Sequence, residues 1–131
     1  MSFGKREYDR QKPEIDSPGT EAPTELKIVD IVVGDGPEAK PGDTVSTHYV
    51  GVAWSTGEEF DASWYRGAPL DFRVRVGQVI QGWDQGLLGM KVGGRRRLEI
   101  PSELAYGSRG AGSAIGPNES LIFVVDLLAV R

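Results

Sequence analysis

Few side chains in this chain could do polar chemistry. Its 131 residues include one histidine, His48, and no cysteine. Thiolate nucleophiles, iron–sulfur clusters and thiolate zinc sites are therefore excluded. A Ser/His/Asp triad or a multi-histidine metal site would have to be built around His48 alone, and neither a Gly-x-Ser-x-Gly elbow nor a His-Glu-x-x-His pair occurs. We expect no metal site and no cofactor, and we interpret His48 as a structural residue on a strand.

The charged and glycine-rich clusters of the sequence do not indicate a catalytic or nucleic-acid-binding site either. The carboxylates Glu58, Glu59 and Asp61 fit an exposed turn better than paired-carboxylate catalysis, which needs a second group across a substrate. The only basic run is Arg95–Arg97, in a chain with 15 basic and 19 acidic residues and a net charge of -4. We therefore expect solvated arginines on a strand and no nucleic-acid binding. Gly107–Gly112 lacks the Lys-Ser/Thr of a phosphate-binding loop and is interpreted as a surface loop.

The remaining candidates are aromatic side chains distributed along the chain: Tyr49, Phe60, Trp83, Tyr106 and Phe123. Such an excess of aromatic residues is unusual for polar catalysis. For any one of them alone, a place in the hydrophobic core is the simplest interpretation.

Short β-type segments between glycine and proline turns must position these residues. The predicted strands are Leu26–Val33, Thr44–Trp54, Glu59–Asp61, Leu70–Val76, Arg95–Ile100 and Leu121–Arg131. In the predicted strand Leu70–Val76, apolar and polar residues alternate strictly, which places Leu70, Phe72, Val74 and Val76 on one face. Within Gln81–Met90, the apolar residues have helical spacing, which predicts a short helix weakened by three glycines. The expected fold class is α+β, an antiparallel sheet with one helix across its apolar face.

The first 25 residues, Met1–Glu25, are rich in charge and proline and poor in apolar side chains. They cannot bury enough surface to offset their ordering entropy, so we predict a flexible arm over 1–25 and one domain over 26–131. The segment lacks the apolar region of a secretory signal. The longest apolar stretch, Leu121–Val130, contains Asp126 and is too short to span a bilayer. We expect a cytoplasmic protein without membrane contact.

The globular part carries seven motifs in order: Val45–Gly51 (VSTHYVG), Gly57–Ser63 (GEEFDAS), Pro69–Phe72 (PLDF), Gly77–Leu87 (GQVIQGWDQGL), Ile100–Pro101, Ala105–Gly107 (AYG) and Leu121–Leu128 (LIFVVDLL). Taken together, they resemble the FKBP family of peptidyl-prolyl cis-trans isomerases. The resemblance covers about Leu26 to Arg131. It implies a half-barrel, a curved antiparallel sheet of about five strands wrapped around one short α-helix, which agrees with the periodicity.

The resemblance also implies a site. Its catalytic residues would be Asp61, Tyr106, Tyr49 and Phe123, and its substrate-binding residues would be Trp83, Phe60, Val79, Ile80, Leu70 and Ile115. Trp83 would form the floor of the pocket, and Asp61 would act electrostatically beside Tyr49. The Tyr106 hydroxyl and the Ile80 backbone N–H would hold substrate carbonyls. Leu70 replaces a common aromatic residue and Ala111–Gly116 is rich in small residues, which predicts a looser lid and weaker macrolide binding.

The activity implied by the resemblance is cis-trans isomerisation of X–Pro bonds, which assists protein folding. A dry aromatic pocket favours the twisted, less polar transition state and needs no nucleophile or metal. The expected ligands are proline-containing segments of client proteins and macrolides such as FK506 or rapamycin, bound by a monomer. Two alternatives stay open: a binding module that recognises proline-containing segments with incidental turnover, and a nucleic-acid binder that uses Arg95–Arg97.

Overall fold

The computed structural model describes residues 11–15 and 21–131. Within them, the chain forms six strands, one α-helix and three 3-10 turns. The strands are β1 (Lys27–Val32), β2 (Thr44–Ala53), β3 (Glu59–Ala62), β4 (Leu70–Arg73), β5 (Arg95–Ile100) and β6 (Leu121–Val130). The helix is α2 (Gln81–Gly86), and the 3-10 turns are η1 (Ser63–Arg66), η2 (Ser102–Leu104) and η3 (Gly107–Arg109). No helix in this part of the chain is long and apolar enough to cross a membrane.

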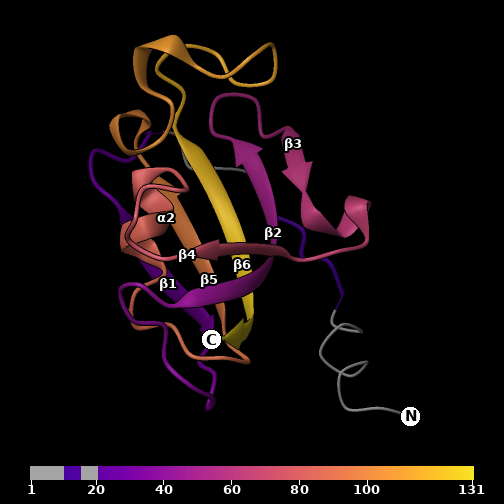
Figure 1. The fold of residues 1–131 in the computed structure, drawn as a ribbon. Helices are drawn as coiled ribbons and strands as arrows, with labels where there is room; N and C mark the ends of the chain where they lie inside the picture. The colour runs from indigo at the N-terminus through magenta and orange to yellow at the C-terminus, as the bar shows by residue number, and fades with distance from the viewer. Residues whose placement is uncertain (1–10, 16–20) are drawn as a thin grey trace.

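The strands form one antiparallel sheet in the order β1-β5-β6-β2-β3, and β4 pairs with the start of β2 (Figure 1). The longest ladder joins β2 to β6. The same edge of β2 pairs first with β4, over Thr44–Thr47, and then with β3, over Val50–Val52. The α+β prediction is confirmed, although the sheet has six strands rather than about five, because two short strands share this edge.

The short helix α2 packs closely against β5 because two of its residues lack a side chain. A Cβ on Gly82 would lie 2.6 Å from Ile100 Cγ2, and one on Gly86 would lie 2.8 Å from Leu98 Cδ2. The glycines that weaken the helix therefore permit its approach to the sheet. The helix is shorter than the predicted segment Gln81–Met90, and the chain turns away at Gly89, whose φ is +79°.

The predicted strand Leu70–Val76 also ends early. Strand β4 stops at Arg73, and the backbone then turns through Arg75 and Gly77, whose φ values are 72° and 79°. The Asp84 carboxylate accepts hydrogen bonds from both of their N–H groups, at 2.8 and 3.0 Å. Val76 is consequently 46% exposed whereas Phe72 is buried, so the prediction that both lie on one face of the strand was wrong.

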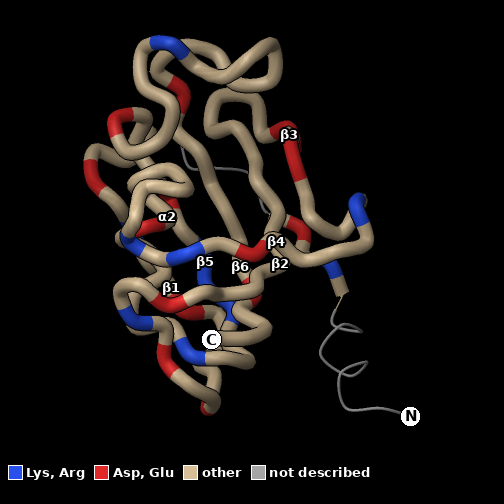
Figure 2. The backbone as a smooth tube through the Cα atoms, viewed as in Figure 1, with Lys and Arg blue, Asp and Glu red and all other residues tan. Residues whose placement is uncertain are grey.

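The basic run on β5 is engaged in ion pairs rather than solvated, contrary to the prediction. The three pairs are Arg95–Asp126 (2.6 Å), Arg96–Asp30 (2.7 Å) and Arg97–Glu99 (3.0 Å). Arg96 is also buried and donates to the Gly86 and Leu88 carbonyls at the end of α2. Figure 2 shows acidic and basic positions near one another on β1, β5 and β6. Carboxylates within the fold therefore neutralise the run.

Much of the predicted N-terminal arm, residues 1–10 and 16–20, lies outside the described residues. The described stretch Gln11–Ile15 contacts the sheet. The Gln11 carbonyl accepts a hydrogen bond from Arg95 (3.0 Å), and Ile15 packs against a cluster that includes Val50 and Val52. The division into an arm and a domain stays a prediction.

Candidate functional site

A cavity of about 400 Å³ opens between the sheet, the start of α2 and the loop that carries Tyr106. It is lined by Tyr49, Phe60, Asp61, Leu70, Gln78, Val79, Ile80, Trp83, Tyr106 and Phe123. All the site residues predicted from the sequence except Ile115 are in this set. Gln78 is an additional lining residue, and its side-chain carbonyl accepts the Arg73 N–H at 2.9 Å.

A glycine near the end of β2 brings two walls of the cavity together. Gly51 lies opposite Asp61 on β3 and opposite Phe123 on β6. A Cβ on Gly51 would lie 2.6 Å from both Phe60 Cζ and Phe123 Cε1. These rings meet edge-to-face with their centroids 5.6 Å apart. The sequence analysis missed this role, although a glycine inside a strand indicates a close approach.

The floor of the cavity is the buried indole of Trp83. Its ring meets Tyr49 edge-on at 5.1 Å between centroids and Phe123 at 5.2 Å, a favourable geometry for aromatic pairs. Phe72 packs against it at 5.5 Å. The indole N–H has no hydrogen-bond partner among the described residues. The floor is therefore an environment of aromatic rings with few hydrogen-bond acceptors.

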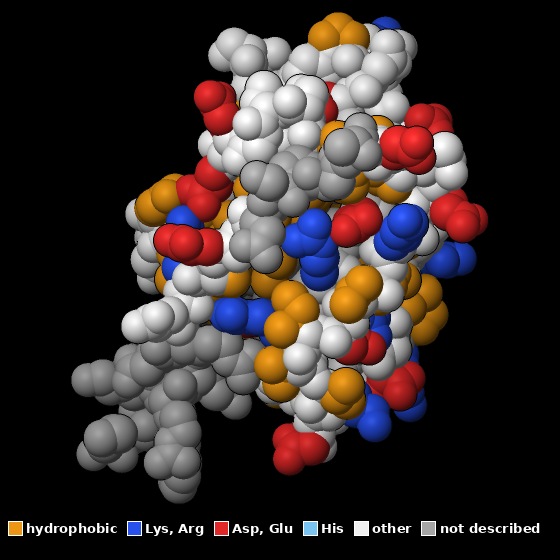
Figure 3. Space-filling model, turned by 180° about the vertical axis from the view of Figure 1, so that it is seen from behind, with side chains coloured by type: hydrophobic (Ala, Val, Ile, Leu, Met, Phe, Trp, Pro, Cys, Tyr) orange, Lys and Arg blue, Asp and Glu red, His pale blue; other side chains and the backbone are white. Residues whose placement is uncertain are grey.

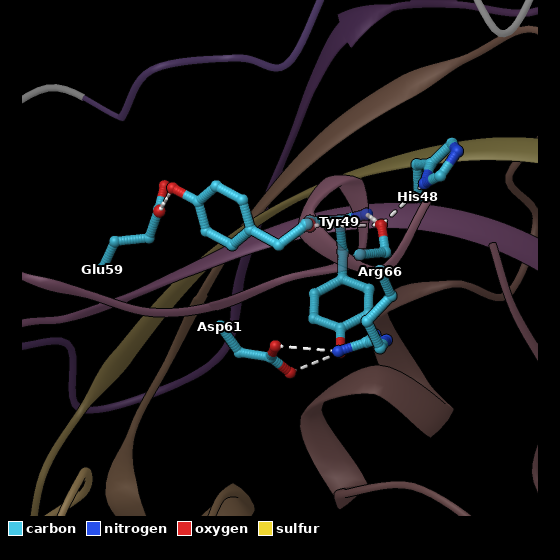
Figure 4. Close-up of polar contacts among 7 residues, drawn as sticks. His48, Tyr49, Glu59, Asp61 and Arg66 are labelled. Carbon is cyan, nitrogen blue, oxygen red and sulfur yellow. Dashed lines mark hydrogen bonds and ion pairs between the residues drawn. The ribbon is translucent and has the colours of Figure 1, made fainter. Parts of the chain in front are cut away.

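Three side chains form a hydrogen-bonded network at the edge of the cavity (Figure 4). The Tyr49 hydroxyl donates to Asp61 Oδ2 at 2.5 Å. Arg66, from η1, donates to Asp61 Oδ1 at 2.9 Å and to the Tyr49 hydroxyl oxygen at 2.7 Å. The network therefore holds the Asp61 carboxylate at both oxygens. The sequence analysis did not identify Arg66, because spacing alone does not show that a side chain five residues later returns to Asp61.

The ionisation of this network follows from its surroundings. Burial raises the pKa of Tyr49, and its hydrogen bond to Asp61 acts in the same direction. Burial also raises the pKa of Tyr106, with the negative charge of Asp61 adding to the effect. The hydrogen bond to Tyr49 raises the pKa of Arg66. At neutral pH both phenols therefore keep their protons, and the Arg66 guanidinium stays charged.

Two further groups at the cavity can donate hydrogen bonds. Tyr106 is 41% exposed, and its hydroxyl has no hydrogen-bond partner within the described part of the chain. Ile80 caps the start of α2, and its backbone N–H donates to no group within residues 11–15 and 21–131. Both donors are thus available to a ligand.

The predicted wall residue Ile115 lies outside the cavity lining. It is buried in the main core and pairs with Ala111 through backbone hydrogen bonds of 2.8 and 3.2 Å. This pairing closes a turn in the loop between Tyr106 and Phe123. A role for Ile115 in substrate binding stays a prediction.

The histidine points away from this cavity, on the opposite face of β2. His48 Nδ1 lies 2.7 Å from the Ser63 hydroxyl oxygen, and its ring stacks on Trp64 with centroids 4.6 Å apart. Burial lowers the pKa of His48, partly offset by the charge of Asp126. These contacts fit the structural role predicted for this residue. The described residues contain no group of three or more His, Cys, Asp or Glu side chains that could hold a metal ion.

Comparisons with known proteins agree with this arrangement. The family model described as FKBP-type peptidyl-prolyl cis-trans isomerase matches residues 36–128. The chain is 67% identical over 121 residues to the FK506-binding protein of Streptomyces anulatus, covering 92% of this chain and 98% of that protein. It is 50% identical over 94 residues to the peptidyl-prolyl cis-trans isomerase FPR2 of Saccharomyces cerevisiae, covering 72% and 70%. The crystal structure of AtFKBP13 superposes with a TM-score of 0.76 at 45% identity, covering 84% of this chain and 96% of that one.

Proposed function

Because the chain belongs to the FKBP-type peptidyl-prolyl cis-trans isomerases, we propose that it rotates X–Pro bonds inside the cavity floored by Trp83. The family activity is acceleration of this rotation, which assists protein folding. The observation that carries the assignment to this cavity is its combination of an aromatic floor with one carboxylate held at the rim. The nucleic-acid alternative has little support, since carboxylates neutralise Arg95–Arg97.

The chemistry requires stabilisation of a twisted amide. Resonance makes rotation about an X–Pro bond slow, with a barrier of ~18–20 kcal/mol. In the twisted transition state the amide loses resonance and its C–N linkage becomes less polar. A water-poor aromatic site binds that state better than the planar ground state, and only such a difference in binding accelerates the reaction.

Each lining residue other than Gln78 has a proposed role in this reaction. The proline ring would rest on Trp83 between Phe60 and Phe123. The Tyr106 hydroxyl and the Ile80 N–H would donate hydrogen bonds to substrate carbonyls. Asp61, held by Tyr49 and Arg66, would act electrostatically beside the twisting carbonyl. Val79 and Leu70 would complete the apolar wall, with Leu70 contacting a large apolar residue before the proline.

The same cavity is the proposed site for macrolides. Relatives of the chain are named FK506-binding proteins, which supports binding of FK506 or rapamycin here. Leu70 in place of an aromatic residue should weaken that binding, as should a looser lid in the loop Ala111–Gly116, where Ala111, Ala114 and Gly116 are small. We also propose that the protein is a cytoplasmic monomer that acts on proline-containing segments of client proteins.

NMR exchange spectroscopy on a short Leu-Pro peptide, with and without the protein, tests the proposal. We expect faster cis-trans exchange, suppressed by FK506. Acceleration that FK506 does not suppress would retain the activity and contradict the shared macrolide site. Absence of acceleration by folded protein would contradict the proposal and favour a binding module that recognises proline-containing segments.

A further inference from the structure

The segment Gln11–Ile15, here called the strap, is attached at its first residue to the start of β5. The Gln11 carbonyl accepts a hydrogen bond from Arg95 Nη2 at 3.0 Å. Arg95 is itself fixed, because its guanidinium donates twice to the buried carboxylate of Asp126, at 2.6 and 2.8 Å. The strap is thus attached to β5 and, through Asp126, to β6.

The last residue of the strap is attached to another part of the sheet. Ile15 and Trp64 pack against a small apolar cluster of β2 and β3, made of Val50, Val52 and Ala62. Tyr49 and Phe123 belong to the separate core cluster beside the cavity, so this contact lies on the opposite face of the sheet. Figure 3 shows the molecule from behind, where Lys and Arg side chains lie among apolar ones.

Between these two attachments, Lys12 contacts the wall that carries the proposed catalytic carboxylate. Lys12 Nζ lies 2.6 Å from Glu59 Oε1 and 5.1 Å from the centroid of the Tyr65 ring. The Tyr65 hydroxyl donates to the other oxygen of Glu59. Lys12, Glu59 and Tyr65 therefore join the strap, β3 and η1 in one cluster, which we call the latch.

The latch is partly exposed to water, and Tyr65 is 71% exposed. The Lys12 and Glu59 side chains retain 29% and 26% of their exposure. The hydrogen bond to Glu59 raises the pKa of Lys12, so the ammonium group stays charged at neutral pH. Burial alone would raise the pKa of Glu59, but hydrogen bonds from Lys12 and Tyr65 lower it overall. Both partners are therefore ionised when the enzyme works.

The cavity wall formed by β3 and η1, which Lys12 contacts, has few backbone hydrogen bonds to the rest of the sheet. Strand β3 has four residues and lies at the end of the strand order. Among the described residues it pairs only with β2, with an irregular register between Gly51 and Val52. Phe60 and Asp61 directly follow Glu59, and Arg66 directly follows Tyr65. Displacement of Glu59 or Tyr65 would therefore shift the neighbouring residues that line the cavity or lie at its edge.

We propose that Lys12 is a positioning residue for the isomerase reaction, holding the β3–η1 wall through Glu59 and Tyr65 so that Asp61 keeps its place at the cavity. The role for Asp61 rests on the proposed function. The N-terminal arm would thereby contribute to catalysis from the face opposite the substrate.

Full-length Lys12→Gln tests this, with Lys27→Gln as the matched control. Lys27 is an exposed β1 residue that makes no ion pair within the described residues, so the control removes the same charge. We expect kcat/KM to fall roughly two- to fivefold in Lys12→Gln, as suits a partly exposed ion pair, and to stay at the wild-type value in Lys27→Gln. Lys12→Arg should retain the wild-type value, because the longer cation can still reach Glu59.

Two readouts separate positioning from a general loss of stability. The backbone amide resonances of Phe60 and Asp61 should shift in Lys12→Gln and not in Lys27→Gln, under conditions where both variants are fully folded. In a double-mutant cycle, Glu59→Gln should have little further effect on kcat/KM once Lys12→Gln is present.

The proposal is overturned if Lys12→Gln matches Lys27→Gln in kcat/KM and in these resonances, or if the effects of Lys12→Gln and Glu59→Gln add. A wild-type protein that does not accelerate exchange would contradict the proposed function instead. The amide resonances would still report whether the latch positions the wall, so the two failures are distinguishable.

Discussion

Replacing Gly51 with alanine should disturb the cavity, because the new methyl group would enter the contact between two of its walls. The added Cβ would lie 2.6 Å from Phe60 Cζ and 2.6 Å from Phe123 Cε1. Favourable carbon–carbon contacts lie at about 3.5–4.0 Å, so the rings must yield by about 1 Å. Phe123 is buried against Trp83, whereas Phe60 is half-buried on the edge strand β3. We therefore expect Phe60 to move.

The energetic cost has two opposing parts. Inserting a methyl group into a packed site costs about 1–3 kcal/mol. Alanine also restricts the unfolded chain, which returns about 0.4–1 kcal/mol, since Gly51 does not have a positive φ that alanine would avoid. The free energy of unfolding should fall by roughly 1–2 kcal/mol, equivalent to roughly 3–10 °C in the unfolding midpoint. Because a 1 Å displacement of a binding group is costly for catalysis, kcat/KM should fall roughly 10- to 100-fold.

Gly116→Ala is the matched control, since a Cβ there meets no atom within 4 Å and its φ is not positive. Thermal unfolding and peptide exchange, measured on both variants, give the comparison. Gly116→Ala should stay within about 0.5 kcal/mol of the wild type. If Gly51→Ala unfolds and catalyses like Gly116→Ala, the argument that this glycine makes room for the two rings is wrong.

Three further predictions concern the network, the floor and the histidine. Asp61→Ala should lower kcat/KM about tenfold with a small change in the unfolding midpoint, because Asp61 is partly exposed; unchanged catalysis would exclude its electrostatic role. Trp83→Ala and Phe123→Ala should each lower the free energy of unfolding, measured with denaturant, by about 3–5 kcal/mol and should also abolish activity. Activity retained by a folded variant would contradict the assignment of this cavity as the substrate site. Burial lowers the pKa of His48 below its ordinary 6.5. The positive charge of Arg66 lowers this pKa further, and the negative charge of Asp126 offsets part of the decrease. The contribution of His48 to stability is thus complete above pH 6.5 and is lost as pH falls through the lower folded pKa. Unfolding free energies between pH 5.5 and 7.5 should therefore depend less on pH in His48→Phe than in wild type; equal slopes would contradict this.

Periodicity and residue order in the sequence predicted the main elements. Short β-type segments between glycine and proline turns located the strands, and the helical spacing of apolar residues within Gln81–Met90 located the helix, because these patterns depend on neighbours along the chain. The motif resemblance also identified most residues that line the cavity, since their types and order are properties of the chain itself. The ends of α2 and β4 differed because turns at Gly89 and Arg75 depend on local backbone conformation.

The tertiary structure decided which side chains meet. Gly51 lies opposite both Asp61 and Phe123, and the second pairing joins residues far apart in sequence. The network of Arg66 with Tyr49 and the contact of Lys12 with Glu59 depend equally on register and on the path of the chain. A periodic pattern indicates the face on which a residue lies, but not the residue across from it. That choice is made by packing and strand pairing, so only the folded chain shows how its carboxylate, rings and N-terminal segment are combined.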